Sequence, residues 1–93
     1  MNIDKRAIVS ENAKIGQDVE IGPFAIIEGH VELGRRVKVW PHAHVCSGTT
    51  VGEETQIHMG AVVGHVPQDI TFENKPSFLN IGKRNVIREY ATI

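Results

Sequence analysis

The sequence is poor in cysteine, in aromatic residues and in excess charge. A single cysteine, Cys46, excludes an internal disulfide and a zinc site built from several cysteines. Ten Lys and Arg against eleven Asp and Glu leave a net charge of −1, which argues against a nucleic-acid surface or a polybasic membrane anchor. No apolar run is longer than Phe24–Ile27, so we expect neither a transmembrane segment nor a signal peptide. With aromatics at only 5%, residues 1–93 are expected to form one small domain whose core is not built on rings.

Aliphatic residues recur at every sixth position. From Ile3 to Ile93, fourteen of sixteen such positions are Ile, Leu or Val, where chance would give about four. A small residue often stands two positions earlier, as at Ala25, and glycine often follows, as at Gly22 and Gly52. Because side chains alternate faces along a strand, the small and the aliphatic residue both point inward. We expect the glycine to let the backbone turn through conformations closed to other residues.

Each hexad therefore predicts one short strand and one corner. Three hexads close a triangular coil, and coils stack ~4.8 Å apart through parallel hydrogen bonding. The expected fold class is all-β, a parallel β-helix of about five triangular coils with a narrow aliphatic core. A helical fold is excluded, because a period of ~3.6 residues would scatter the aliphatic positions around the helix surface.

The period fails once, between Val63 and Ile81. The two expected inward positions in this stretch are Asp69 and Lys75. A charge inside so thin a core would be prohibitive, so residues 65–80 are expected to leave the wall as a protruding loop. Loops on rigid scaffolds often carry function, and an insertion without a role is the alternative.

One outward face differs from the other two. Residues one coil apart stack, and one outward column is mostly apolar: Ile8, Ile26, His44 and Val62. The two other outward columns are polar. We expect the apolar face to pack against sister chains in a trimer, with Phe24, Ile26, Met59 and Val62 near its centre. Scattered apolar surface residues are the alternative.

Three motifs go beyond the repeat: Ile21-Gly-Pro-Phe24, Pro67-Gln-Asp69 and Ile81-Gly-Lys-Arg-Asn-Val-Ile-Arg-Glu-Tyr-Ala-Thr-Ile93. With them the whole chain resembles the amino-terminal third of the UDP-N-acetylglucosamine O-acyltransferases of lipid A biosynthesis, a hexapeptide-repeat family. The resemblance implies that the β-helix is left-handed and the protein cytoplasmic. It also implies transfer of a 3-hydroxyacyl chain from acyl carrier protein to the sugar 3-hydroxyl of UDP-N-acetylglucosamine. No metal or other cofactor is implied, and the sites lie between neighbouring subunits of a homotrimer.

The resemblance also implies roles for residues of the interrupted stretch. Gln68 and Asp69 match family residues that line the substrate cleft, where amide and carboxylate groups hold hydroxyls by hydrogen bonds. Solvated polar side chains of a loop are the alternative. Thr71 stands where the family often has Lys, and Lys75 is a candidate replacement. The catalytic base of the family, a histidine, lies beyond the last motif, so we expect no catalytic residue in this chain and no activity from it alone.

None of the five histidines matches a catalytic position of the family: His30, His42, His44, His58 and His65. His65 is expected to be an exposed loop residue. The spacing of His42 and His44 is compatible with metal binding, but one falls at a corner and the other on an outer face, with no third ligand evident. We therefore predict no metal site, which argues against a metal-dependent hexapeptide enzyme such as a γ-class carbonic anhydrase. Cys46 follows an inward aliphatic and is expected to pack rather than to act as a nucleophile.

Two other functions stay open. One is that of another hexapeptide-repeat transferase, for example the N-acyltransferase that acts later in the same pathway. That enzyme carries an extra domain before its repeats, whereas here the hexads begin at Ile3. The other is a non-catalytic β-helix that serves as a scaffold.

Overall fold

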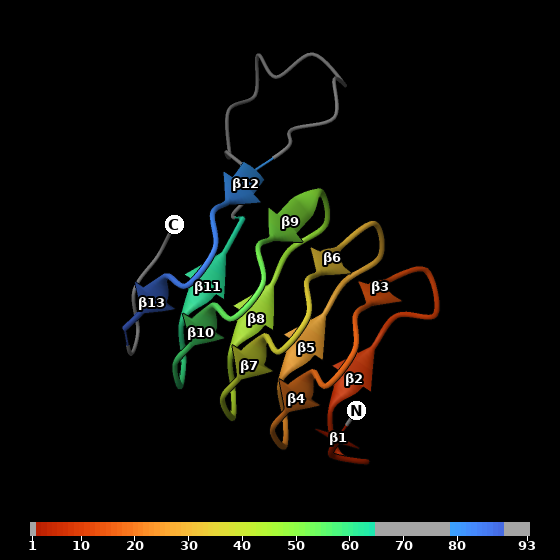
Figure 1. Ribbon diagram of the computed structural model, residues 1–93. Coiled ribbons are helices and arrows are strands. Elements are labelled where there is room, and N and C mark those ends of the chain that lie inside the picture. Colours follow the sequence, from red (N-terminus) through yellow and green to blue (C-terminus); the bar gives the residue numbers. More distant parts are fainter. Residues whose placement is uncertain (1, 65–78, 89–93) are drawn as a thin grey trace, which may run out of the picture.

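A computed structural model describes residues 2–64 and 79–88, which form a three-sided parallel β-helix (Figure 1). Within the described residues the chain has thirteen short strands, arranged in three parallel sheets. The first sheet contains β1 (Asn2–Ile3), β4 (Glu20–Ile21), β7 (Lys38–Val39), β10 (Gln56–Ile57) and β13 (Val86–Ile87). The second contains β2 (Ile8–Val9), β5 (Ile26–Ile27), β8 (His44–Val45) and β11 (Val62–Val63). The third contains β3 (Lys14–Ile15), β6 (Glu32–Leu33), β9 (Thr49–Val51) and β12 (Leu79–Ile81).

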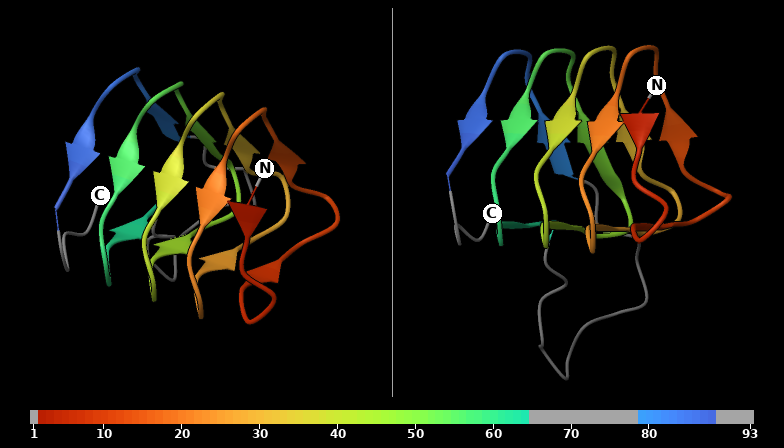
Figure 2. Two further views of the ribbon diagram at one scale, coloured as in Figure 1. Left: turned by 60° about the horizontal axis from the view of Figure 1, so that its bottom comes forward. Right: turned by 90° about the horizontal axis from the view of Figure 1, so that it is seen from below.

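Successive strands of one sheet belong to successive coils. In the third sheet Ile15 pairs with Leu33 and Leu33 with Val51, each 18 positions further along the chain. The coils are joined by backbone hydrogen bonds, such as that from the Lys14 N–H to the Val31 carbonyl at 2.8 Å. Figure 2 shows the resulting coils lying side by side along the axis of the helix. The predicted all-β solenoid, with three strands to a coil, is confirmed.

The core is a narrow column of aliphatic and small side chains. Every sixth residue from Ile21 to Val63 is at most 3% exposed. The positions two residues earlier are fully buried: Val19, Ala25, Val31, Val37, Ala43, Thr49, Thr55 and Ala61. Each fully buried Val or Ile contributes about 1.5–3 kcal/mol by leaving water, so this column is the main source of stability.

The corners turn at residues other than the expected glycines, which corrects the role predicted for glycine. Left-handed φ angles recur at every sixth position: Asp18, Phe24, His30, Arg36, His42, Gly48, Glu54, Gly60 and Arg84. Gly22 and Gly52, which directly follow an inward aliphatic, do not have such angles. They are needed for another reason, because a Cβ on Gly52 would lie 2.6 Å from the carbonyl carbon of Gly82 in the next coil. Glycine at this position allows stacked coils to approach closely.

The third sheet places the end of the interrupted stretch two residues earlier than predicted. Strand β12 begins at Leu79, so Leu79 and Asn80 belong to the wall and the predicted loop 65–80 is too long at this end. Ile81 pairs with Val51, 30 positions earlier, instead of the usual 18. The extra length equals two hexads, which is why the six-residue phase continues unchanged after the interruption.

The outward side chains of the first and third sheets are mostly polar and pair along the helix axis. Lys14 lies 3.5 Å from Glu32, and Lys38 lies 3.9 Å from Glu20. Such exposed ion pairs contribute little stability, at most about 1 kcal/mol each. The outward faces of these two sheets are solvated, polar surfaces, as the sequence predicted. Residues 2–64 and 79–88 include no helix that is long and apolar enough to cross a membrane.

We predict that Gly52→Ala lowers the free energy of unfolding by about 1–3 kcal/mol, because the new methyl group would overlap the backbone of the next coil. The matched control is Gly29→Ala, where the nearest atom is the flexible Ser10 Oγ at 3.3 Å and φ is not left-handed. Urea denaturation of both variants measures the difference. Equal stability of the two variants would contradict the close-approach explanation.

Candidate functional site

The residues predicted to contact substrate, Gln68 and Asp69, lie outside the described residues, as do His65, Thr71 and Lys75. The structure does describe where the wall is left and rejoined, after Val63 and before Leu79. Gly64, the last described residue before the interruption, has a φ of 83°, and a Cβ there would overlap the Thr49 hydroxyl. Glycine is therefore required at this point for both its conformation and its size.

The corner between the second and third sheets repeats below Gly64 in the earlier coils. The Cys46 N–H donates to the Val63 carbonyl at 2.7 Å, and the Glu28 N–H donates to the Val45 carbonyl at 3.0 Å. Because Val63 pairs with Val45 and Val45 with Ile27, the residues that follow them, Gly64, Cys46 and Glu28, stack in one column.

Three side chains with ligand or acid–base chemistry meet at this corner. Glu28 Oε2 lies 2.7 Å from His44 Nε2, and Glu28 Oε1 accepts the Ser47 N–H at 2.9 Å. The Cys46 thiol completes the group, and the ligand atoms of Glu28, His44 and Cys46 all lie within 4.8 Å of one another. Glu28 and His44 are partly exposed, whereas Cys46 is only 7% exposed. We call these three residues the corner cluster.

The surroundings of the corner cluster shift the pKa values of its two acidic groups in opposite directions. The hydrogen bond from the Ser47 N–H, together with that from His44, lowers the pKa of the Glu28 carboxyl. Burial, together with the negative charge of Glu28, raises the pKa of the Cys46 thiol. A free thiol that stays protonated is a poor nucleophile. Cys46 is therefore buried, and its thiol is not activated as a nucleophile, in agreement with the prediction.

His42 and His44 do not converge. His42 lies at a corner, where its ring stacks on Phe24 with ring centres 5.3 Å apart, while His44 lies on strand β8 and contacts Glu28. His30 is also a corner residue, with a φ of 56°. The ring of His58 lies 5.0 Å from that of Trp40, near the corner between the first and second sheets. The predicted positions of the histidine pair, one at a corner and one on an outer face, are confirmed.

The outward face of the second sheet carries the predicted column. Ile8, Ile26, His44 and Val62 lie in register on β2, β5, β8 and β11. Ile8 and Phe24 are 64% and 51% exposed, and Met59 is 40% exposed. Ile26 and Val62 are half-buried. The column and its exposure are as predicted, while the expectation that it forms a subunit interface stays a prediction.

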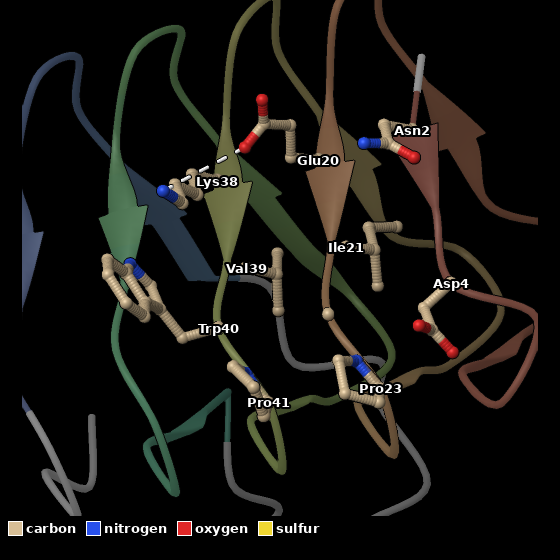
Figure 3. Close-up of a pocket in the computed structure, with 10 residues that line it drawn as sticks. Asn2, Asp4, Glu20, Ile21, Pro23, Lys38, Val39, Trp40 and Pro41 are labelled. Atoms are coloured by element: carbon tan, nitrogen blue, oxygen red, sulfur yellow. Dashed lines mark ion pairs between the residues drawn. The ribbon is translucent and has the colours of Figure 1, made fainter.

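A shallow groove of about 260 Å³ runs across the first sheet, between β1 and Trp40 (Figure 3). Its charged groups are paired with one another or with neighbours. Lys38 Nζ lies 3.9 Å from Glu20 and 4.4 Å from the centre of the Trp40 ring, and Asp4 accepts hydrogen bonds from Arg6. Because its charged groups are paired and its shape is open, this groove is typical of a solvated surface rather than of a reaction site.

The sequence did not reveal the corner cluster, because columns one coil apart were compared only for the outward faces and not for the position that follows each inward aliphatic. Glu28 and Cys46 both occupy the position directly after an inward aliphatic, one coil apart, where glycine stands in six other hexads. Comparing that column in the same way would have placed these two side chains together, with His44 beside them. The available signal was a carboxylate and a thiol one coil apart in the same column.

We predict that Glu28 stabilises the fold above the ordinary carboxyl pKa and that this stabilisation is lost as the pH falls through its lowered pKa in the folded state. The free energy of unfolding of the unchanged chain, relative to Glu28→Gln, should therefore shrink between about pH 7 and pH 3. Urea denaturation at several pH values measures it. Glu11→Gln, on the exposed corner below, is the control. If the free energy of unfolding of the unchanged chain relative to Glu11→Gln falls by as much over this pH range, the assignment to Glu28 is contradicted.

The fold and its repeat define a class of protein, the parallel β-helices built from hexapeptide repeats. Residues 12–47 and 30–65 match the family described as bacterial transferase hexapeptide (six repeats), and the chain belongs to this family.

Named relatives agree with the resemblance seen in the sequence. The chain is 38% identical over 91 residues to the acyl-[acyl-carrier-protein]–UDP-N-acetylglucosamine O-acyltransferase of Thermodesulfovibrio yellowstonii, a match that covers 98% of this chain and 35% of the relative. It is 39% identical over 92 residues to the enzyme of the same name from Rickettsia typhi, covering 99% and 35%. The chain thus spans about a third of the length of the curated relatives it matches.

Solved structures give the same result. A crystal structure of a UDP-N-acetylglucosamine acyltransferase superposes with a TM-score of 0.93 at 39% identity, covering 99% of this chain and 36% of that one. The acyltransferase LpxA of Bacteroides fragilis 9343 superposes with a TM-score of 0.90 at 38% identity, covering 96% and 35%. The fold is the left-handed parallel β-helix that the resemblance implied.

Proposed function

We propose that this chain forms the amino-terminal coils of a cytoplasmic O-acyltransferase of lipid A biosynthesis. The enzyme transfers a 3-hydroxyacyl chain from acyl carrier protein to the 3-hydroxyl of UDP-N-acetylglucosamine. In this proposal Gln68 and Asp69 hold hydroxyl groups of the substrates by hydrogen bonds, and the base that removes the sugar proton is supplied from outside these 93 residues.

The observation that carries the proposal is identity spread over nearly the whole chain, 38–39% to enzymes of one name. The repeat alone is common to many transferases, but the two-hexad interruption is a further feature of this chain. Its sequence contains Pro67-Gln-Asp69, and the wall resumes in register at Leu79. A solenoid that keeps its phase across an insertion holds the inserted segment at one fixed corner, which suits a segment that must meet substrate.

A chimera tests the proposed activity. We predict that residues 1–93, joined to the remaining two thirds of the Thermodesulfovibrio yellowstonii relative, give an enzyme that acylates UDP-N-acetylglucosamine from 3-hydroxyacyl carrier protein. In this chimera Asp69→Asn or Gln68→Ala should lower kcat/KM by about 10–100-fold, the effect of losing a hydrogen bond to a charged or polar substrate group. Release of the carrier thiol and the mass of the product measure transfer.

The unjoined chain gives the background for that assay, and Glu11→Gln on the exposed corner is the matched control for loss of a carboxylate. A chimera that folds and assembles yet transfers no acyl group would contradict the proposed function. Full activity in the Asp69→Asn and Gln68→Ala chimeras would instead contradict the roles given to these two residues.

We further propose that the enzyme is a homotrimer and that the outward face of the second sheet lies at the subunit contact. Ile26 and Val62 are outward aliphatic residues in register on one face, and Phe24 and Met59 extend this face at the adjoining corner. The other two faces carry mostly polar side chains, several of them ion-paired, so this face would gain the most free energy by leaving water. At ~25 cal/mol per Å², each large apolar side chain covered on assembly contributes on the order of 1–2 kcal/mol.

Replacing Ile26 or Val62 with Glu should therefore weaken or abolish the trimer, because each variant places a charge in a desolvated contact. The matched control is Gln56→Glu on the outward face of β10, beside Lys38, which should leave assembly unchanged. Sedimentation or light scattering gives the mass in solution. A trimer that survives Ile26→Glu together with Val62→Glu would refute the face assignment.

A further inference from the structure

The corner cluster brings together one carboxylate, one imidazole and one thiol on adjacent coils. Glu28 and Cys46 follow the register pair Ile27 and Val45, and His44 lies outward on β8 beside them. Their ligand atoms lie within 4.8 Å of one another. These three groups are the side chains that bind Zn²⁺ in proteins, and the combination of a thiolate with an imidazole selects zinc-type ions over Ca²⁺ or Mg²⁺.

The scaffold under the cluster holds it in place. The Ser47 N–H fixes one oxygen of Glu28 at 2.9 Å, and the Ser47 hydroxyl donates to the Gly29 carbonyl at 2.7 Å. The Cys46 N–H is bonded to the Val63 carbonyl at 2.7 Å. The backbones that carry the three side chains are therefore fixed by hydrogen bonds between coils, and only side-chain torsions remain to adjust.

The distances suit a tetrahedral ion after a small adjustment. With bonds of about 2.0–2.3 Å, a tetrahedral zinc centre holds its ligand atoms ~3.3–3.7 Å apart. The contact between His44 and Glu28, now 2.7 Å, would open by less than ~1 Å, and the thiol would close by about as much. In the single chain His44 and Glu28 are 35% and 39% exposed, so there an ion would reach the cluster from solvent and keep a fourth position for water.

We propose that Glu28, His44 and Cys46 form a binding site for a zinc-type divalent ion. The ion would link the second coil to the third and lie one level below Gly64, where the chain leaves the wall. It is a different site from the His42 and His44 pair considered in the sequence. The ion has no role in the proposed acyl transfer, so a failure to bind zinc would leave the proposed function unaffected.

The test uses the reduced, purified chain with Zn²⁺ and Co²⁺ as probes. Equilibrium dialysis is expected to give one ion per chain, and the Co²⁺ form a sulfur-to-cobalt charge-transfer band. Cys46→Ser should remove that band, and Cys46→Ser and His44→Val should each weaken Zn²⁺ binding by about 100-fold. Val suits position 44, because the same outward column carries Ile26 and Val62.

Glu28→Gln replaces only an outward carboxylate, so this variant tests the proposed site if another variant fails to fold. It should weaken binding at least ~10-fold. The matched control is His30→Asn, which removes an exposed imidazole at a neighbouring corner and tolerates the φ of 56° there. Zinc binding weaker than about 10 μM, or equal binding by the unchanged chain and the folded Cys46→Ser or Glu28→Gln variant, would overturn the proposal. A loss in His30→Asn as large as in these variants would do the same.

Discussion

Hydrogen bonding between stacked coils is the constraint on which the rest of this structure depends. Each described strand is only two or three residues long, and the inner strands of each sheet are held by partners one coil before and after them. Stacking at ~4.8 Å leaves no space for a Cβ at several of the turns that follow an inward aliphatic. Gly16, Gly22, Gly34 and Gly52 meet that requirement, since a Cβ on any of them would lie within 2.9 Å of the next coil. Glycine therefore serves the distance between coils, while the left-handed angles fall three residues after the aliphatic, mostly on larger residues that carry the strain of ~1 kcal/mol or more each.

The same stacking gives every surface position a fixed neighbour one coil away. Charges of opposite sign meet along the first and third sheets, as in Lys14 with Glu32 and Lys38 with Glu20. The second sheet instead presents Ile8, Ile26 and Val62 to solvent, interrupted by His44. The three sides of one coil thus differ in chemistry although they share one backbone, which is how a repeat with identical geometry acquires a face suited to a partner.

Function in such a fold depends on departures from the repeat. An insertion of two hexads between Val63 and Ile81 changes neither the phase nor the face of the residues that follow, so the core tolerates it. One of the three motifs on which the family resemblance rests, Pro67-Gln-Asp69, belongs to that insertion. The corner below it has Glu28 and Cys46 at a position where glycine stands in six other hexads, and these two residues bring a carboxylate and a thiol to His44.

The sequence by itself determined the coil, its inward positions and its three faces. Side chains alternate between the two faces of a strand, so a six-residue period assigns a residue to the inside or the outside from its position in one strand. It also showed the interruption, since a charge at an inward position cannot be buried. Only the tertiary structure decided how close particular atoms of neighbouring coils lie. The reason for the glycines, the start of β12 at Leu79 and the meeting of Glu28 with His44 and Cys46 all depend on contacts between residues 16–30 positions apart. Such contacts depend on where individual side chains and Cβ atoms lie between stacked coils, and a periodic pattern read along one strand does not contain those positions.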